Sequence, residues 1–287
     1  MTRTPEQRVQ VVIVTMNRHD DLARTLRHLR DLPERPGVVV VDNGSTPPVE
    51  SVVRDVHPDA EVLTLPHNLG GAGRTEGVRR CTAPYVAFCD DDSWWAPRSL
   101  RRAADLFDAH PVLGLVAARV LVGPEQRLDP ISAIMAESPL PGRDGVGPGV
   151  LGFLACGAVV RREAYLAVGG FHRQFGIGGE EALLAMDLAD GGWDLCYVDD
   201  LVAHHHPATT TRDPSARRRR QWRNDLWTLA LRRRMGTVLR GARAAVGDPV
   251  GRGALYDAVR GVPWVARERR RLGRDVEARL RLLEAAG

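Results

Sequence analysis

Short apolar runs alternate along the first ninety residues with segments whose apolar positions recur at helical spacing. Four runs are mostly apolar, and they cover 9–15, 38–41, 61–65 and 85–89. Runs of this length with few polar positions predict strands that are buried on both faces of a sheet. Between the first two runs, Leu22, Leu26 and Leu29 predict a helix. The alternation predicts a Rossmann-like α/β fold, with a mostly parallel sheet flanked by helices.

The pattern changes twice after residue 122. Residues 123–152 are rich in Pro and Gly, which predicts a long loop. A further strand is expected over 194–203, just before three consecutive histidines, and from residue 212 onward the chain becomes helical and basic. We therefore predict an α/β domain over 1–211 and an Arg-rich helical extension over 212–287.

Charge is distributed unevenly between these two parts. All 40 basic residues are Arg and the net charge is +4. The extension holds 20 Arg against 8 acidic residues, a net charge of +12, so residues 1–211 carry −8. Such an extension suits an anionic membrane surface, a second subunit in a homodimer, or the acidic domain of its own chain, and the sequence leaves these three open.

Apolar residues in the extension recur among the arginines. Residues 222–231 have apolar positions at helical spacing and are expected to pack on the α/β domain. Further apolar positions, interleaved with Arg, are Trp264, Leu272, Val276, Leu280 and Leu283. This second set predicts a basic amphipathic helix. Its partner is again an anionic membrane, a second subunit or the acidic domain of its own chain.

Composition disfavours several classes of protein. No run of 18 apolar residues is present and residues 1–10 lack an apolar signal-peptide core, so we expect a cytoplasmic protein, at most peripheral at the inner face of the membrane. No CxxC pair is present, which predicts buried free thiols at Cys81, Cys89, Cys156 and Cys196. No recognised RNA-binding module accompanies the run Arg217–Arg220, so no nucleic-acid partner is expected.

Polar residues follow the first, second and fourth predicted strands. They are Thr15 to Arg18, Asp42 to Ser45, and Asp90 to Asp92. In open α/β sheets ligands bind at the carboxyl ends of the strands. These three clusters therefore predict a ligand site at one edge of the sheet.

Asp90, Asp91 and Asp92 are candidates for a metal site. Adjacent carboxylates repel one another unless a cation offsets their charge, and hard divalent cations such as Mn²⁺ or Mg²⁺ prefer oxygen ligands. His204 and His206 lie two positions apart at a strand end and so point to one side, where an imidazole can complete the coordination. The alternatives are a solvated turn and a surface histidine tract. We expect a divalent metal on Asp90, Asp92 and His204 or His206.

A glycine-rich turn precedes the third predicted helix. Asn68, Gly70 and Gly71 lie in it, and Arg74 adds a positive charge. Glycines at a helix N-terminus let backbone N–H groups approach an anion such as pyrophosphate. A plain tight turn is the alternative.

Two further groups suit sugar chemistry. Glu180 and Glu181 follow a glycine-rich stretch and open a predicted helix, where a carboxylate can take a proton from a hydroxyl. The alternative is that these acids stabilise the helix N-terminus. Trp94 and Trp95 follow the aspartates; we expect Trp95 to stack on a sugar ring, although at least one of the two suits the core.

Taken together and in order, these motifs resemble the family 2 glycosyltransferases with the A-type nucleotide-sugar fold, especially galactofuranosyl- and rhamnosyltransferase-like bacterial members. The resemblance covers about Val9 to Thr211, through VVIVTMNR, VVVVDNGS, NLGGAGR, AFCDDDSWW, GGFHRQF with GEEALLAMDLADGGW, and LVAHHHP. The chain departs from the family at Glu181, where members usually have Asp, and at Asp187, where they often have Arg. Thr75 and Glu76 replace the usual Asn of the glycine-rich segment.

The resemblance implies a nucleotide-sugar-binding catalytic domain that transfers a sugar from a nucleotide-diphosphate donor to an acceptor hydroxyl, with a divalent metal and inversion at the anomeric carbon. Glu181 would be the catalytic base, with Glu180 as the alternative. Asp42 would contact the nucleobase, in a pocket lined by Thr15 and Arg18. The residues expected to contact the donor are Thr15, Asn17, Arg18, Asp42, Asn68, Gly70, Gly71, Arg74, Asp90, Asp91 and Trp95. The alternative functions are a nucleotidyltransferase and a nucleotide-sugar-binding protein without catalysis. The acceptor, whether a glycan, a lipid-linked sugar or a small molecule, is left open.

Overall fold

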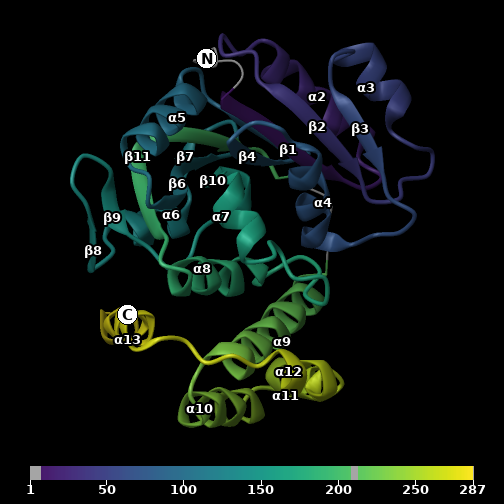
Figure 1. Cartoon of the computed structure of the whole chain (residues 1–287). Coiled ribbons are helices and arrows are strands. Elements are labelled where there is room, and N and C mark those ends of the chain that lie inside the picture. The colour runs from purple at the N-terminus through teal and green to yellow at the C-terminus, as the bar shows by residue number, and fades with distance from the viewer. Residues whose placement is uncertain (1–7, 208–212, 287) are drawn as a thin grey trace.

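The computed structural model describes residues 8–207 and 213–286 (Figure 1). Its strands join one 11-stranded sheet in the order β3-β2-β1-β4-β10-β6-β11-β9-β8, with β5 paired to β11 and β7 to β6. The strands are β1 (Val9–Thr15), β2 (Gly37–Asp42), β3 (Glu61–Thr64), β4 (Tyr85–Asp90), β5 (Ser93–Trp95), β6 (Leu113–Val122), β7 (Arg127–Leu128), β8 (Leu140–Arg143), β9 (Gly147–Gly149), β10 (Ala158–Arg161) and β11 (Asp194–His205).

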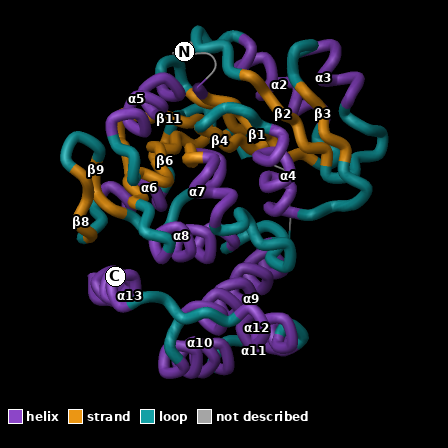
Figure 2. Tube along the Cα trace, in the orientation of Figure 1, coloured by secondary structure: helices purple, strands orange, loops and turns teal. Residues whose placement is uncertain are grey.

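Helices cover both faces of the sheet and form the C-terminal part of the chain (Figure 2). Those of the α/β domain are α2 (His19–Arg30), α3 (Glu50–Val56), α4 (Gly73–Arg80), α5 (Ser99–Ala109), α6 (Pro130–Ala136), α7 (Arg162–Ala167) and α8 (Glu180–Asp190), with 3₁₀ turns η1 (Gly70–Ala72) and η2 (Ala155–Gly157). Those of the extension are α9 (Pro214–Arg232), α10 (Met235–Val246), α11 (Pro249–Val259), α12 (Val262–Glu268) and α13 (Arg274–Ala286).

The predicted α/β fold is confirmed, with a mixed sheet whose strands are mostly parallel. β1, β2, β3 and β4 run parallel in the order that right-handed crossovers produce, and β6 runs parallel to β11. β10 lies antiparallel between β4 and β6. The sheet therefore changes direction at β10, just beside the strand that ends in Asp90.

The predicted long loop over 123–152 is wrong in part. Asp129 accepts a hydrogen bond from the Ile131 backbone N–H and Pro130 follows it, so the pair starts helix α6. β8 and β9 then pair as a hairpin, and β9 adds to β11. The high content of Pro and Gly reflects a helix start and a tight hairpin, as well as turns.

Two apolar layers lie on opposite faces of the sheet. Successive residues of β1 alternate between them: Val11 and Ile13 pack with α2 and α5, whereas Val12 and Val14 pack with α4 and α7. All four cysteines are buried free thiols, as predicted. Both faces of the central strands are thus buried, which leaves their carboxyl ends as the place where polar groups collect.

Gly77 lets α4 lie directly on the sheet. A Cβ atom at this position would be 2.5 Å from Val12 Cγ1 and 2.9 Å from Val41 Cγ2, and both valines are fully buried. We expect Gly77→Ala to lower the free energy of unfolding by about 1–3 kcal/mol, because overpacking outweighs the gain in helix propensity. Urea denaturation measures this.

The matched control is Gly236→Ala in α10. A Cβ there meets nothing within 4 Å, so stability should be unchanged or raised by up to about 1 kcal/mol. Equal stabilities for Gly77→Ala and the parent chain would contradict the close packing of α4.

The helices of the extension pack on the α/β domain (Figure 1). Leu226 and Leu231 of α9 share an apolar cluster with Phe175 and Leu183, which confirms the packing expected for residues 222–231. Val276 and Leu280 of α13, from the second apolar set, are buried in the core beneath the sheet. The boundary predicted between 211 and 212 falls outside the described residues. No helix within 8–207 or 213–286 is long and apolar enough to cross a membrane.

Candidate active site

The ends of β1, β2 and β4 lie side by side. In the sheet register Thr15 pairs with Asp42, and Val14 pairs with Asp90. The three polar clusters that the sequence indicated therefore meet at one edge. This geometry is the consequence of parallel strands of matching length.

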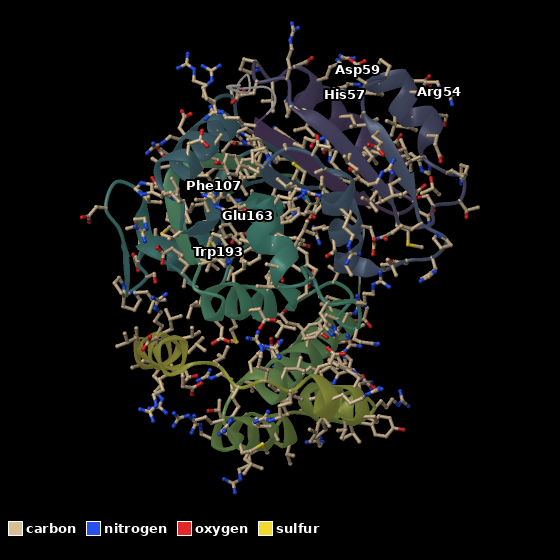
Figure 3. All side chains as sticks on the ribbon, viewed as in Figure 1. Arg54, His57, Asp59, Phe107, Glu163 and Trp193 are labelled. Carbon is tan, nitrogen blue, oxygen red and sulfur yellow. The ribbon has the colours of Figure 1, made fainter. Side chains whose placement is uncertain are left out.

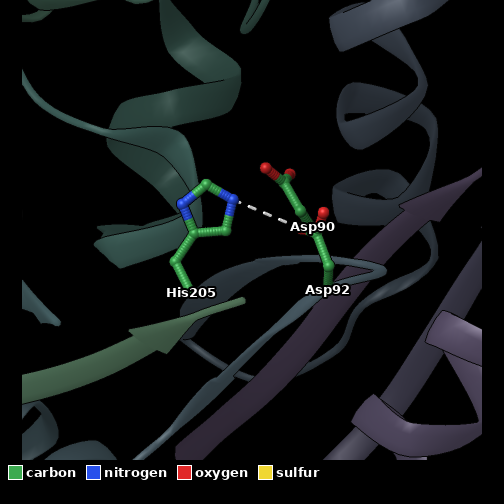
Figure 4. A group of neighbouring side chains, drawn as sticks. All are labelled: Asp90, Asp92 and His205. Carbon is green, nitrogen blue, oxygen red and sulfur yellow. Dashed lines mark ion pairs between the residues drawn. The ribbon is translucent and has the colours of Figure 1, made fainter. Parts of the chain in front are cut away.

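Asp90, Asp92 and His205 form a compact group at this edge. Each offers one ligand atom, and these atoms all lie within 4.8 Å of one another. His205 Nε2 is 3.4 Å from Asp92 Oδ1 (Figure 4). Two carboxylates and an imidazole match the ligand preferences of Mn²⁺ and suit Mg²⁺ through their oxygens. The residues present therefore fit a divalent metal.

The histidine in this group differs from the prediction. His204 and His206 do share one side, as expected, but that side faces Trp94, at ring-centroid distances of 5.8 and 4.7 Å. His205 points the opposite way, toward the carboxylates. The register of β11 shifts between Val198 and Val202. This irregularity lies in the stretch that leads to the histidines, so spacing in the sequence did not indicate which side would face the aspartates.

Charge around Asp92 keeps it ionised. Burial alone would raise its pKa, but a hydrogen bond from His205 and the nearby Arg18 guanidinium lower the pKa to about 2. The pKa of His205 is raised in turn. Burial alone would lower it, but the hydrogen bond to Asp92 and the charge of that carboxylate outweigh burial. Arg18 Nη2 is 2.9 Å from Asp92 Oδ2. The carboxylate is thus available to a cation across the physiological pH range.

Asp91 has a different environment from its neighbours. It is 5% exposed, accepts a hydrogen bond of 2.9 Å from Thr15 Oγ1 and pairs with Arg18 Nη1 at 2.6 Å. Burial raises its pKa to about 7. Asp91 therefore fixes Thr15 and Arg18 in position, while Asp90 and Asp92 face the metal side.

The predicted nucleobase pocket is held together by its own side chains. Asp42 is fully buried, and its carboxylate accepts backbone N–H bonds from Ser45 at 2.8 Å and Val49 at 3.2 Å. Asn17 Oδ1 accepts the Thr46 N–H at 2.8 Å. Asp42 and Asn17 thus shape the turn after β2. A direct contact of Asp42 with the nucleobase stays a prediction, as does a contact of Asn17 with the donor.

The glycine-rich turn makes room for another loop. The Gly70 N–H donates to Asn68 Oδ1 at 2.6 Å, and the Gly71 N–H donates to the Gly176 carbonyl at 2.8 Å. A Cβ on Gly70 would lie 2.6 Å from Gly176 Cα, and one on Gly71 would lie 2.6 Å from Glu180 Oε1. Both N–H groups already have acceptors, so the glycines bring Glu180 close rather than present free donors to an anion.

Arg74 joins the metal group to the glutamate pair. Arg74 is 3% exposed, and its guanidinium is hydrogen-bonded to Asp90 and lies 3.8 Å from Glu180 Oε1. Burial works against its charge, but the carboxylates of Asp90, Glu180 and Glu181 outweigh burial and raise its pKa. A permanent cation therefore lies between the candidate metal group and Glu180, the neighbour of the candidate base.

Glu180 and Glu181 differ in what holds them. Glu180 is 2% exposed and accepts a hydrogen bond from the Gly178 N–H. Glu181 is only partly buried, and its carboxylate is bonded to its own backbone N–H rather than to the preceding loop. Burial, together with the Glu180 charge, raises the pKa of Glu181 to about 8. Burial also raises the pKa of Glu180. Glu181 is thus the more exposed member of the pair and the better placed to exchange a proton.

Asn224 holds the loop that positions this pair. Its Nδ2 donates to the carbonyls of Phe175 at 3.0 Å and Gly178 at 2.6 Å, which uses both of its N–H bonds. Arg223 also donates to Phe175 O, at 2.8 Å. Sequence reasoning gave neither residue a role in the site; the signal was their position as a polar pair inside an apolar helical stripe.

The structure places Trp95 in the core. Its side chain is 1% exposed and its Nε1–H donates to Phe88 O at 3.2 Å, so it presents no face to a sugar. The expectation for Trp95 is therefore wrong, because β5 pairs with β11 and turns this ring inward. Trp94 is partly exposed and stacks on His28 at 3.9 Å.

Known proteins resemble this chain in sequence and in fold. A pre-mycofactocin glycosyltransferase of Mycobacterium tuberculosis is 35% identical over 208 residues, which cover 68% of this chain and 42% of that protein. The mannosyltransferase PcManGT from Pyrobaculum calidifontis, solved with GDP-Man and Mn²⁺, superposes with a TM-score of 0.59 at 22% identity, over 98% of this chain and 76% of that one. TarS 1–349 of S. aureus, in complex with UDP-GlcNAc, superposes with a TM-score of 0.60 at 17% identity. This superposition covers 77% of this chain and 66% of that one.

The sequence profile of glycosyl transferase family 2 matches residues 10–169. This match covers more than half of the chain and includes the polar clusters after β1, β2 and β4. The two solved structures show that the fold is the A-type fold predicted from the motifs. The chain therefore belongs to glycosyl transferase family 2.

Proposed function

We propose that this protein is an inverting, metal-dependent glycosyltransferase that moves a sugar from a nucleotide-diphosphate donor to an acceptor hydroxyl. One observation carries the proposal: Arg74 links Asp90, in the metal group, to the Glu180–Glu181 pair. A leaving diphosphate and an attacking hydroxyl need a cationic side and a basic side within one site. The structures solved with GDP-Man and with UDP-GlcNAc support a donor of this class.

Each side chain has a defined task in this proposal. Asp90, Asp92 and His205 would hold a divalent ion, which supplies charge stabilisation to the diphosphate when bound. Arg74 keeps its charge at any physiological pH and offsets negative charge on the departing phosphate oxygens. Arg18 keeps Asp91 and Asp92 in place.

Glu181 is the proposed base. Its raised pKa gives a carboxylate that takes a proton readily near neutral pH, which favours general-base catalysis. It takes the proton of the acceptor hydroxyl as that oxygen bonds to the anomeric carbon and the bond to the diphosphate oxygen breaks. Attack opposite the leaving group inverts the configuration. Glu180, hydrogen-bonded to Gly178, positions the start of α8.

A nucleotide-sugar screen tests the function. The purified full chain is incubated with Mn²⁺ or Mg²⁺, a panel of nucleotide sugars and candidate hydroxyl acceptors, and released nucleoside diphosphate is measured. NMR of the product then gives the anomeric configuration. Release of pyrophosphate from nucleoside triphosphates would indicate a nucleotidyltransferase instead. Donor binding without turnover on any acceptor would favour a non-catalytic binding protein.

The metal site makes a prediction that separates the three histidines. We expect His205→Ala to weaken Mn²⁺ binding by more than the roughly 10- to 100-fold that loss of an outer-shell partner costs, because a direct ligand is removed. His204→Ala is the matched control, since His204 bonds to Gln126 and faces Trp94. Titration of Mn²⁺, followed by its EPR signal, measures both. If His204→Ala binds Mn²⁺ more weakly than His205→Ala does, then His204 is the metal ligand, as the sequence predicted.

A further inference from the structure

Exposed apolar side chains are concentrated in three consecutive helices of the extension. The large apolar residues of α10, α11 and the start of α12 that are 52–62% exposed are Met235, Leu239, Val246, Tyr256, Val259 and Val262. These six residues, with the exposed arginines among them, are called the outer face below. The second apolar set indicated by the sequence packs inward, with Val276 and Leu280 buried. The outer face is thus a different surface from the one the sequence suggested.

Helical spacing places the three residues of α10 on the side that faces away from α9. In α10, Met235, Leu239 and Val246 follow one another by four and seven positions and so share one side. The opposite side packs inward: Ala245 is 1% exposed, and a Cβ on Gly241 would meet Leu229 of α9 at 2.6 Å. Figure 1 shows α10, α11 and α12 on the side of α9 that is remote from the sheet.

The same segment of the chain is strongly basic. Between residues 234 and 267 the exposed cations are Arg234, Arg240, Arg243, Arg252, Arg260 and Arg267. The acids of this segment are Asp248 and Asp257, and α9 neutralises both, through Arg218 at 3.0 Å and Arg219 at 2.7 Å. Arg260 also approaches Asp257, at 3.8 Å. The outer face therefore presents apolar side chains among positive charges with no exposed acid.

We propose that the outer face docks on an anionic lipid bilayer. Arginines with long apolar stems place their charge among lipid phosphates while neighbouring apolar side chains enter the headgroup boundary. Anionic lipids attract such a surface by roughly a factor of five per basic residue. A second copy of the chain fits less well, because a two-fold contact would set the same arginines against one another. This binding is independent of the proposed chemistry.

Flotation with vesicles tests the proposal. The full chain is mixed in low-salt buffer with vesicles of phosphatidylcholine alone or of equimolar phosphatidylcholine and phosphatidylglycerol. We expect it to float with the anionic vesicles and to be released by salt. Arg240→Glu with Arg243→Glu should weaken binding at least about 25-fold, since two attractive charges are lost. Leu239→Ser with Tyr256→Ser should weaken it roughly tenfold through lost apolar contact.

The control reverses two charges elsewhere. Arg54 on α3 (Figure 3) and Arg101 on α5 are exposed and lie outside the extension. Arg54→Glu with Arg101→Glu should keep at least half of the binding. The proposal would be overturned if this control lost as much vesicle binding as Arg240→Glu with Arg243→Glu. It would also be overturned if the parent chain floated with neither kind of vesicle. Sedimentation showing a dimer that Arg240→Glu with Arg243→Glu dissociates would also overturn it, by making the outer face a contact between copies.

Discussion

Asp92→Ala is expected to lower the rate of sugar transfer by at least about 10³-fold, because it removes a metal ligand and with it charge stabilisation of the diphosphate. Asp92 is suited to this role by its low pKa, which keeps protons from competing with a cation. Its loss also leaves His205 without the carboxylate that lies 3.4 Å away. Steady-state assays over a range of Mn²⁺ concentrations measure the effect, with Mn²⁺ binding followed separately.

Asp21→Ala provides the matched control. Asp21 also accepts a hydrogen bond from Arg18, at 2.9 Å, but lies outside the metal group. Its loss should leave Mn²⁺ binding intact and most of the activity in place. If Asp92→Ala binds Mn²⁺ as tightly as the parent chain, the metal assignment fails. If the two variants lose activity equally while both bind Mn²⁺, the placement of Arg18 is what matters.

Glu181→Gln is expected to reduce the rate by roughly 10²–10⁴-fold with donor binding nearly unchanged, the usual contribution of a general base. The amide keeps the shape of the side chain but takes no proton. Glu180→Gln is the informative comparison, because Glu180 is buried and already bonded to Gly178. We expect it to impair positioning and to cost less. If Glu180→Gln is the inactive variant and Glu181→Gln turns over normally, the two roles are reversed.

The pH dependence follows from the same residue. Because burial and Glu180 raise the pKa of Glu181 to about 8, activity should rise with pH and level off above this value. Stability should change in the opposite direction. The folded chain holds this proton more tightly than the unfolded chain, so the free energy of unfolding falls as pH rises from 4.5, the ordinary pKa of Glu, to about 8. Glu181→Gln should lose the rising limb of activity and be at least as stable as the parent at pH 8. A parent pH profile that is flat across this range would contradict the assignment.

The sequence predicts the fold well because the strand pattern is simple. Strands buried on both faces leave only their ends for polar residues, so the clusters after β1, β2 and β4 had to converge. The position of Arg74 at this edge was also accessible, because Arg74 lies in the first turn of the helix that follows the glycine-rich turn. Its contact with a donor diphosphate stays a prediction.

The remaining site residues depend on contacts between distant segments. His205 faces the aspartates after a register shift in β11, which spacing alone does not reveal. The glycines at 70 and 71 are needed by the loop at 176–180, a partner about a hundred residues away. Asp187, which departs from the family pattern, forms an ion pair with Arg232 of α9, with Nη2 donating to Oδ2 at 2.9 Å. Each of these requires knowing which segments meet.

Asn224 lies in the extension, yet both of its N–H bonds hold the loop that leads to Glu180 and Glu181. The active site is therefore not modular. Exchanging the α/β domain between relatives, or expressing it alone, would separate the proposed base from its support unless the matching start of α9 came with it. Sequence divergence faces the same constraint: a change in the 175–178 loop has to be compatible with the residue at 224, so we expect these two distant segments to change together among relatives.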